Sequence, residues 1–339
     1  MSNLNIRPAF EKDNIAIAFA VDQNYVPYLK CAIKSVVANC KRGDLDIIVL
    51  HAGELDARAI TEYFKGKPNL SIRFMDISDI VQREIAPYFV GRGYLTMAAT
   101  YRLFLPNLLP NFDKVIWLDT DIMATGDIAE LFGTELGDCW LGAVVDVGLG
   151  NGPVPEFMAW RRERGRLWAK KYNFEPWEGY FNSGVLLMNL AALREANVRK
   201  RLIEIAVDPC SELPDQDALN VVCRGRVKYL EKRWNFQAQS GSGWVEDGVG
   251  IVHFVGPDKP WSWAETEYVD LLRKWWGYVD AEEVPKLLKI ALESVDKRHK
   301  RELAAVDEYY GKMLREMKHS VSYKLGRAIT KPFRAIFGK

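Results

Sequence analysis

Two carboxylates follow a short apolar run in this chain and could together hold a metal ion. Residues 115–118 are Val, Ile, Trp and Leu, and Asp119, Thr120 and Asp121 follow directly. A continuous apolar run of this length is typical of a strand buried on both faces. If the strand stays extended through Asp121, side chains two positions apart point to one side, so both carboxylates meet at its carboxyl end. Such a pair suits a divalent cation that also binds an anionic group, such as a diphosphate.

Other polar side chains stand at the ends of predicted elements. Asn182 precedes an apolar strand, and Pro214 marks a helix start whose first turn holds acids that complement the helix dipole. His253 lies on a predicted strand, and the turn at Gly256 and Pro257 leads to Lys259. Each feature alone also has a structural explanation, because a single strand histidine is more often a hydrogen-bonded core residue than a ligand.

Strands and helices alternate along the first part of the chain. Apolar runs predict strands over 15–21, 46–51, 71–77, 140–147, 184–190 and 250–254. Helical spacing of apolar residues predicts helices over 28–39 and 55–64. This alternation indicates an α/β protein with a mostly parallel sheet covered by helices. Because ligands of such sheets lie beyond the carboxyl ends of the strands, Asp22 and Asn24 are expected to share a crevice with Asp119 and Asp121.

The two remaining regions have different compositions. Residues 148–179 are rich in Gly, Pro, Arg and Trp and are interpreted as an irregular segment in which acceptor specificity could reside. Residues 265–318 keep helical spacing without strands and predict a helical appendage. Residues 319–339 have five basic side chains, aromatic and aliphatic anchors and no acid, which is typical of a segment that lies on an anionic membrane.

Composition narrows the class of protein. The net charge of +1 over 339 residues argues against nucleic acid as the main partner. The five cysteines show no close pairing and fit reduced thiols. The N-terminus lacks the features of a secretory signal, and no uncharged apolar run is long enough to span a membrane. We therefore expect a cytoplasmic protein, held peripherally at the inner face of the plasma membrane by residues 319–339.

Six segments together resemble glycosyltransferase family eight, the retaining nucleotide-sugar transferases that include bacterial lipooligosaccharide galactosyl- and glucosyltransferases and glycogenin. They occur in the family's order and spacing: Phe19–Tyr25, Tyr101–Leu103, Leu118–Ile122, Phe181–Leu187, Asp215–Asn220 and His253–Trp261. Any one segment is a weak signal, but six in order are specific. The sequence departs from the family at Ser183, where alanine is usual. The resemblance implies a Rossmann-like GT-A fold over residues 14–264.

The resemblance also implies a metal site and a donor site. The metal ligands would be Asp119, Asp121 and His253, a mixed carboxylate and imidazole set that suits Mn²⁺, with Mg²⁺ as an alternative. The implied donor is a UDP-hexose, and the residues that match its site are Ala20, Asp22, Asn24, Tyr25, Arg102, Thr120, Asn182, Gly256 and Lys259. Tyr25 would offer a ring to uridine, and Lys259 a cation to the diphosphate.

Two residues match the family's catalytic positions, Gln216 and Asp215. An amide is a poor nucleophile, so Gln216 is interpreted as stabilising oxocarbenium character at the anomeric carbon. The leaving phosphate would then accept the proton of the acceptor hydroxyl. The implied reaction moves glucose or galactose, with retention, to a saccharide or lipid-linked glycan, as in lipopolysaccharide synthesis.

Three other functions are weighed against this one. A phosphatase with its nucleophile in an Asp-x-Asp motif wants Thr or Val where this chain has Met123. A nucleotidyltransferase would carry a glycine-rich phosphate loop after the first strand, and none is present there. A catalytically silent UDP-sugar-binding scaffold would be expected to have lost Asp119, Asp121 or His253.

Overall fold

The structure of the chain is a computed structural model. It describes residues 6–86, 97–146, 167–168, 170–173, 179–238, 248–256, 259–262 and 269–293, and single positions between 300 and 319. Contacts between residues divide the chain into two compact units, which are described separately. The first comprises residues 1–259 and 266–280, and the second residues 260–265 and 281–339.

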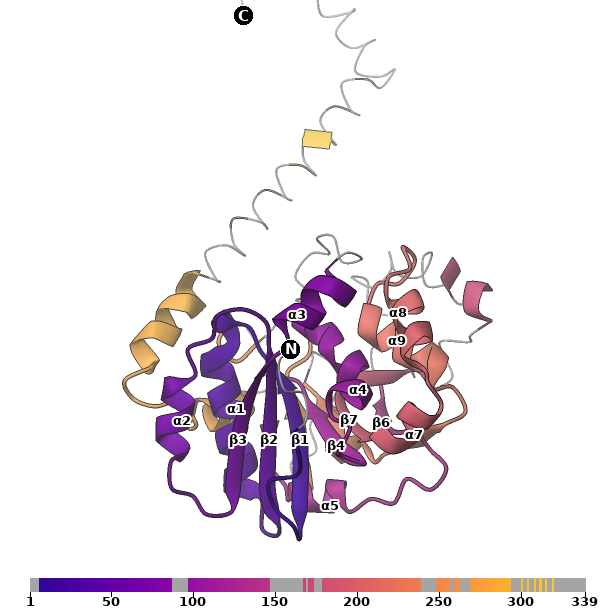
Figure 1. Cartoon of the computed structure of the whole chain (residues 1–339). Helices are drawn as coiled ribbons and strands as arrows, with labels where there is room; N and C mark the ends of the chain where they lie inside the picture. The colour runs from indigo at the N-terminus through magenta and orange to yellow at the C-terminus, as the bar shows by residue number, and fades with distance from the viewer. Residues whose placement is uncertain are drawn as a thin grey trace, which may run out of the picture. The chain divides into compact units, whose positions relative to one another are not determined.

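A seven-stranded sheet forms the centre of the first unit (Figure 1). Its strands, in spatial order, are β3 (Leu70–Asp76), β2 (Asp44–His51), β1 (Asn14–Ala20), β4 (Lys114–Leu118), β7 (Phe181–Asn189), β6 (Leu141–Val145) and β8 (Val227–Tyr229). All neighbouring pairs are parallel except the two that β7 makes with β4 and β6. The prediction of an α/β protein with a mostly parallel sheet is therefore confirmed.

Both faces of this sheet are buried beneath helices (Figure 1). Along β1, Ile17 and Phe19 face one apolar core, whereas Ala16 and Ala18 face the other. The first core includes side chains of α1 (Val26–Asn39), α2 (Arg58–Phe64) and α5 (Ile128–Phe132). The second includes side chains of α3 (Ser78–Ile80), α4 (Leu105–Leu108), α7 (Leu190–Glu195), α8 (Arg199–Ala206) and α9 (Pro214–Val222). Burial on two sides explains why the strand sequences are continuously apolar.

A second, three-stranded sheet holds β10 (Ile251–His253) between β5 (Ile122–Ala124) and β9 (Phe236–Gln237). The sequence predicted a strand over 250–254 but not this separate sheet. The expectation that β4 stays extended through Asp121 is wrong. β4 ends at Leu118, residues 120 and 121 form a turn, and the chain enters β5. After the turn, β5 pairs antiparallel with β10 and not with a strand of the large sheet.

Beyond the sheets, α10 (Val269–Trp276) belongs to the first unit, where Trp275 lies 6.4 Å from Tyr28 between ring centroids. In the second unit, residues 284–293 are helical. The predicted division into 14–264, 265–318 and 319–339 stays a prediction. Residues 320–339 and most of 148–179 lie outside the described residues. In the described part of the chain, no helix combines the length and apolarity needed to cross a bilayer.

Candidate active site

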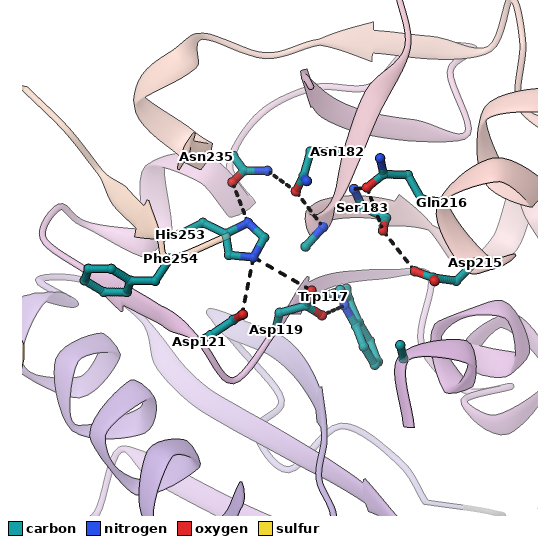
Figure 2. Close-up of polar contacts among 12 residues, drawn as sticks. Trp117, Asp119, Asp121, Asn182, Ser183, Asp215, Gln216, Asn235, His253 and Phe254 are labelled. Atoms are coloured by element: carbon teal, nitrogen blue, oxygen red, sulfur yellow. Dashed lines mark hydrogen bonds and ion pairs between the residues drawn. The ribbon is translucent and has the colours of Figure 1, made fainter. Parts of the chain in front are cut away.

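The turn after β4 and the end of β10 bring the three predicted metal ligands together (Figure 2). His253 pairs with Ile122 across the small sheet, which places its ring beside Asp121. Its Nε2 atom lies 3.3 Å from Asp121 Oδ1 and 4.0 Å from Asp119 Oδ2. These three side chains offer ligand atoms that all lie within 4.8 Å of one another. They form the one such group found among the described residues, and their metal-binding role stays a prediction.

The side chain of Asp121 lies between those of Lys259 and His253. Its Oδ2 accepts a hydrogen bond of 2.5 Å from Lys259 Nζ, whereas its buried Oδ1 has no hydrogen-bond partner in the described part of the chain. Burial alone would raise the pKa of Asp121, but Lys259 and His253 outweigh burial and lower it. A buried carboxylate oxygen without a donor is available to a cation.

Asp119 differs from its neighbour in the partners of its two oxygens. Oδ1 accepts hydrogen bonds from Arg102 Nη2 (2.7 Å) and Trp117 Nε1 (2.9 Å), so Oδ2 is the atom turned toward His253. Burial raises the pKa of Asp119, and the nearby charge of Asp121 adds to the rise while Arg102 opposes it. The two carboxyl groups therefore have pKa values shifted in opposite directions.

Arg102 connects the acidic turn to the predicted catalytic pair. The side chain is 2% exposed, and its guanidinium group lies over the ring of Trp117. It forms ion pairs with Asp119 and, at 3.2 Å, with Asp215, and it donates to the carbonyl oxygen of Ser183. Arg102 was predicted to line the donor sugar, and that role stays a prediction.

Asp215 and Gln216 lie in the first turn of α9, where Pro214 begins the helix as predicted. Ser183 binds both residues. Its hydroxyl lies 2.9 Å from Asp215 Oδ2, and its backbone N–H donates to Gln216 Oε1 at 2.9 Å. The serine that replaces the family's usual alanine thus adds a hydrogen bond to Asp215 (Figure 2).

Two buried residues of the site were missed by the sequence interpretation, Asp146 and Asn235. Asp146 Oδ2 accepts from Gln216 Nε2 (3.0 Å) and Asn182 Nδ2 (3.2 Å). A signal for Asp146 existed, because it lies next to the last residue of the strand predicted over 140–147, as Asp119 lies next to the apolar run 115–118. Asn235 hydrogen-bonds to His253 and Asn182, and its type and spacing gave no signal.

The residues predicted for the uridine pocket follow β1. Ala20 ends the strand, and Asp22 caps a short 3₁₀ helix by accepting from the backbone N–H groups of Asn24 and Tyr25. Burial raises the pKa of Tyr25, and the charges of Asp121 and Asp22 add to the rise. β1 and β4 are parallel neighbours with Ala18 opposite Trp117, so Asp22 and the acidic turn follow the carboxyl ends of adjacent strands. That they share one crevice stays a prediction.

Two other predicted donor residues lie in turns. Thr120 is 9% exposed between the two acids. Gly256 has a φ of +75°, a conformation that favours glycine. Their contacts to a donor stay predictions.

The site also fits a metal by the chemistry of its side chains. A Cβ atom on Gly184 would lie 2.1 Å from His253 Cε1, so the ring rests directly against the backbone of β7. Two carboxylates and an imidazole match the ligand set that Mn²⁺ accepts. The donor set, together with a buried Asp121 Oδ1 that accepts no hydrogen bond from the described residues, fits a divalent cation.

Comparisons with known proteins show the family and the fold of the chain. Glycosyltransferase GlyF of Streptococcus pneumoniae serotype 4 is 27% identical over 278 residues, which cover 78% of this chain but only 61% of GlyF. Lipopolysaccharide 1,3-galactosyltransferase of Salmonella typhimurium is 26% identical over 75% of each chain. The crystal structure of galactosyltransferase LgtC with donor and acceptor sugar analogues is 27% identical, has a TM-score of 0.63, and covers 80% of this chain and 100% of that chain. A model of glycosyl transferase family 8 matches residues 16–264, and the chain belongs to that family, with its GT-A glycosyltransferase fold.

Proposed function

We propose that this protein is a retaining hexosyltransferase that moves glucose or galactose from a UDP-sugar to a saccharide or glycolipid acceptor. Membership of the family supports transfer of a sugar, and the names of two relatives associate them with lipopolysaccharide: a 1,3-galactosyltransferase and a 1,2-glucosyltransferase. The observation on which the proposal rests is the grouping of Asp119, Asp121 and His253 beside Arg102, Asp215 and Gln216.

Asp119, Asp121 and His253 would hold Mn²⁺ or Mg²⁺, which when bound neutralises the diphosphate and supports its departure as a Lewis acid. Lys259 lies against Asp121 and supplies a cation at the same place. Arg102, fixed by Asp119 and Asp215, positions the acidic turn relative to α9. These residues account for binding and orientation of the donor diphosphate.

Gln216 and Asp215 are the proposed catalytic residues. Their side chains are 4% and 5% exposed, and Ser183 and Asp146 hold the amide of Gln216 at both ends. A fixed dipole in a buried site stabilises developing positive charge better than a mobile one does. In retaining transfer the acceptor hydroxyl attacks the face that the phosphate leaves, and the phosphate oxygen takes its proton.

We also propose that residues 319–339 attach the enzyme reversibly to an anionic membrane, where a lipid-linked acceptor is found. Five basic residues at about 1 kcal/mol each give at most roughly 5 kcal/mol before ordering costs. That supports salt-sensitive attachment to the inner face of the plasma membrane and not insertion. The acceptor, the linkage and the choice between glucose and galactose depend on pocket geometry that the motifs do not specify.

The test is release of UDP by the purified full chain. Incubation with UDP-glucose or UDP-galactose, Mn²⁺ and a lipopolysaccharide acceptor is expected to release UDP, and chelation of the metal is expected to stop it. Asp121→Asn should lower the rate by at least about 100-fold, as expected when a metal ligand is lost. The product anomer, determined by NMR, should match that of the donor.

A scaffold that binds UDP-sugars without catalysis is the alternative, and the same experiment separates the two. A scaffold would bind UDP in a Mn²⁺-dependent manner but release none from either sugar nucleotide with any acceptor. Binding without turnover over a panel of saccharide and lipid-linked acceptors would therefore overturn the proposed transferase.

A further inference from the structure

A chain of hydrogen bonds lies behind His253 and has a direction that the backbone fixes. The backbone N–H of Gly184 donates to Asn182 Oδ1 at 3.0 Å, and Asn235 Nδ2 donates to the same oxygen at 2.9 Å. Asn235 Oδ1 lies 3.0 Å from His253 Nδ1. A backbone N–H can only donate, so the atom of Asn182 that faces it must be the carbonyl oxygen. Asn235 must then present its NH₂ to Asn182 and its oxygen to the histidine.

The orientation of Asn182 is fixed from its other end as well. Its Nδ2 donates to Asp146 Oδ2 at 3.2 Å, and an ionised carboxylate can only accept. Reversing the Asn182 amide would place an NH₂ group against the Gly184 N–H and an oxygen against Asp146. Two independent partners therefore select one orientation of the amide.

The orientation of these two amides determines which nitrogen of the His253 ring carries the hydrogen. Because Asn235 offers it an oxygen, Nδ1 must carry a hydrogen, and the neutral ring keeps its lone pair on Nε2. Nε2 is the atom that faces Asp121 Oδ1 at 3.3 Å (Figure 2). The ring is 4% exposed and Asn235 is 0% exposed, so water does not compete for this bond.

We propose that Asn235 is a positioning residue that selects the Nδ1–H tautomer of His253 and aims Nε2 at the cation held by Asp119 and Asp121. The inference rests on the metal site of the proposed function. Hydrogen bonds to the second nitrogen of a ligating histidine commonly set its tautomer and orientation. The same Asn235 amide holds Asn182, so one buried side chain connects the metal site to a predicted donor-binding residue.

The small sheet explains how Asn235 reaches this place. Asn235 ends a 3₁₀ helix (Lys232–Asn235), and β9 follows at once. β9 pairs in parallel with β10, so that Gln237 lies opposite His253. A Cβ atom on Gly250 would lie 2.6 Å from the ring of Trp234, which shows how closely this segment rests on the start of β10. The position of Asn235 is therefore set by strand pairing and close contact.

Two variants of Asn235 distinguish the effect of its hydrogen bond to His253 from the effect of its side-chain volume. Asn235→Leu keeps the approximate volume but removes the acceptor for Nδ1–H. Asn235→Asp keeps an acceptor for Nδ1–H, removes the donor to Asn182 and adds a negative charge beside the ring. Titration of Mn²⁺ without donor, followed by electron paramagnetic resonance, should show about 10–100-fold weaker binding for Asn235→Leu. Asn235→Asp should bind at least as tightly as the wild type.

Nitrogen NMR of the histidine rings provides the second readout and needs no metal. The wild type should show His253 as the Nδ1–H tautomer, assigned by loss of its signals in His253→Gln. Asn235→Leu should lose that preference while Asn235→Asp keeps it. An Nε2–H tautomer in the wild type would overturn the inference even if neither variant folds.

The remaining outcomes distinguish the two proposals. Equal Mn²⁺ affinity in the wild type and folded Asn235→Leu, or a loss of the same size in folded Asn235→Asp, would overturn the role of Asn235. No Mn²⁺ binding by the wild type would overturn the metal site of the proposed function. The ring tautomers of the wild type and Asn235→Leu would still decide whether Asn235 selects Nδ1–H.

Discussion

At the scale of single residues, the close contact between the His253 ring and the backbone of Gly184 leads to a specific prediction. Gly184→Ala would introduce a Cβ atom 2.1 Å from Cε1 of the ring, and the ring would have to move. Gly184 is not in the left-handed region, so its backbone accepts alanine. We expect Mn²⁺ affinity, measured by titration, to fall at least about tenfold, with a cost in unfolding free energy of about 1–3 kcal/mol.

Gly142→Ala is the matched control for that experiment. Gly142 lies in the neighbouring strand β6, and its Cβ would meet Leu136, Leu187 and Leu230 at 3.1–3.3 Å. This variant also crowds the sheet, but it does so away from the metal ligands. Gly142→Ala should therefore lose stability without losing Mn²⁺ affinity. Wild-type affinity in Gly184→Ala would show that the ring is not held where the structure has it.

Replacement of Gln216 by alanine tests the proposed catalytic amide. Gln216→Ala removes a dipole fixed by Ser183 and Asp146, and turnover should fall more than donor affinity does. We expect kcat to fall by about 100-fold, the usual scale for loss of one preorganised group. Steady-state kinetics and direct titration with UDP-sugar measure the two quantities. An unchanged kcat would remove Gln216 from the mechanism.

At the scale of elements, Asp280, which lies four residues after the end of α10, is joined to α1 by two ion pairs. The carboxylate pairs with Lys30 at 2.5 Å and Lys34 at 2.6 Å, and the lysine side chains are only 6% and 11% exposed. Asp280→Asn should lower the free energy of unfolding by about 2 kcal/mol at pH 7, as expected for hydrogen bonds to charged groups. Urea unfolding, followed by circular dichroism, measures this loss.

The contacts of Asp280 with Lys30 and Lys34 also make the free energy of unfolding depend on pH. The direction of that dependence follows from the pKa shift of Asp280. Burial would raise the pKa of Asp280, but hydrogen bonds from Lys30 and Lys34 lower it overall. A carboxyl whose pKa is lower in the folded state stabilises the fold above its unfolded pKa, and that stabilisation is lost as pH falls through the folded pKa. The difference in the free energy of unfolding between the wild type and Asp280→Asn should therefore become smaller at acid pH. Asp270→Asn is the control, because it breaks an exposed ion pair with Arg273. It should have the wild-type free energy of unfolding both at pH 7 and at acid pH.

The elements also show which parts of the fold the sequence could predict. β1 and β2 were recognised because burial on both faces makes their sequences continuously apolar. The small sheet was missed because β5 and β9 have three and two residues, too few for any periodicity. The turn at Asp121 was missed because it leads into β5, whose three residues gave no sign that the chain leaves the large sheet there and pairs with β10.

In the candidate site as well, the sequence predicted some residues and missed others. Asp119, Asp121 and His253 were found because charged or ligating side chains stood at fixed places within six collinear segments. Asn235 was not found, because a buried asparagine has no periodicity and its role depends on which atom of a distant amide faces it. Hydrogen-bond direction is a property of the folded network and not of residue spacing.

At the scale of the whole molecule, the last prediction concerns residues 320–339, which lie outside the described residues. Deletion of this segment should abolish sedimentation of the protein with vesicles that contain phosphatidylserine, because its basic side chains supply the attraction. The catalytic residues all precede it, so UDP release with a soluble saccharide acceptor should stay within about twofold of the full chain. Binding of the full chain should weaken steeply above physiological salt, where the Debye length falls below about 8 Å. Vesicles of phosphatidylcholine alone are the control and should bind neither protein. Salt-independent binding by the full chain, or equal binding after deletion, would show that anionic lipid is not what these residues recognise.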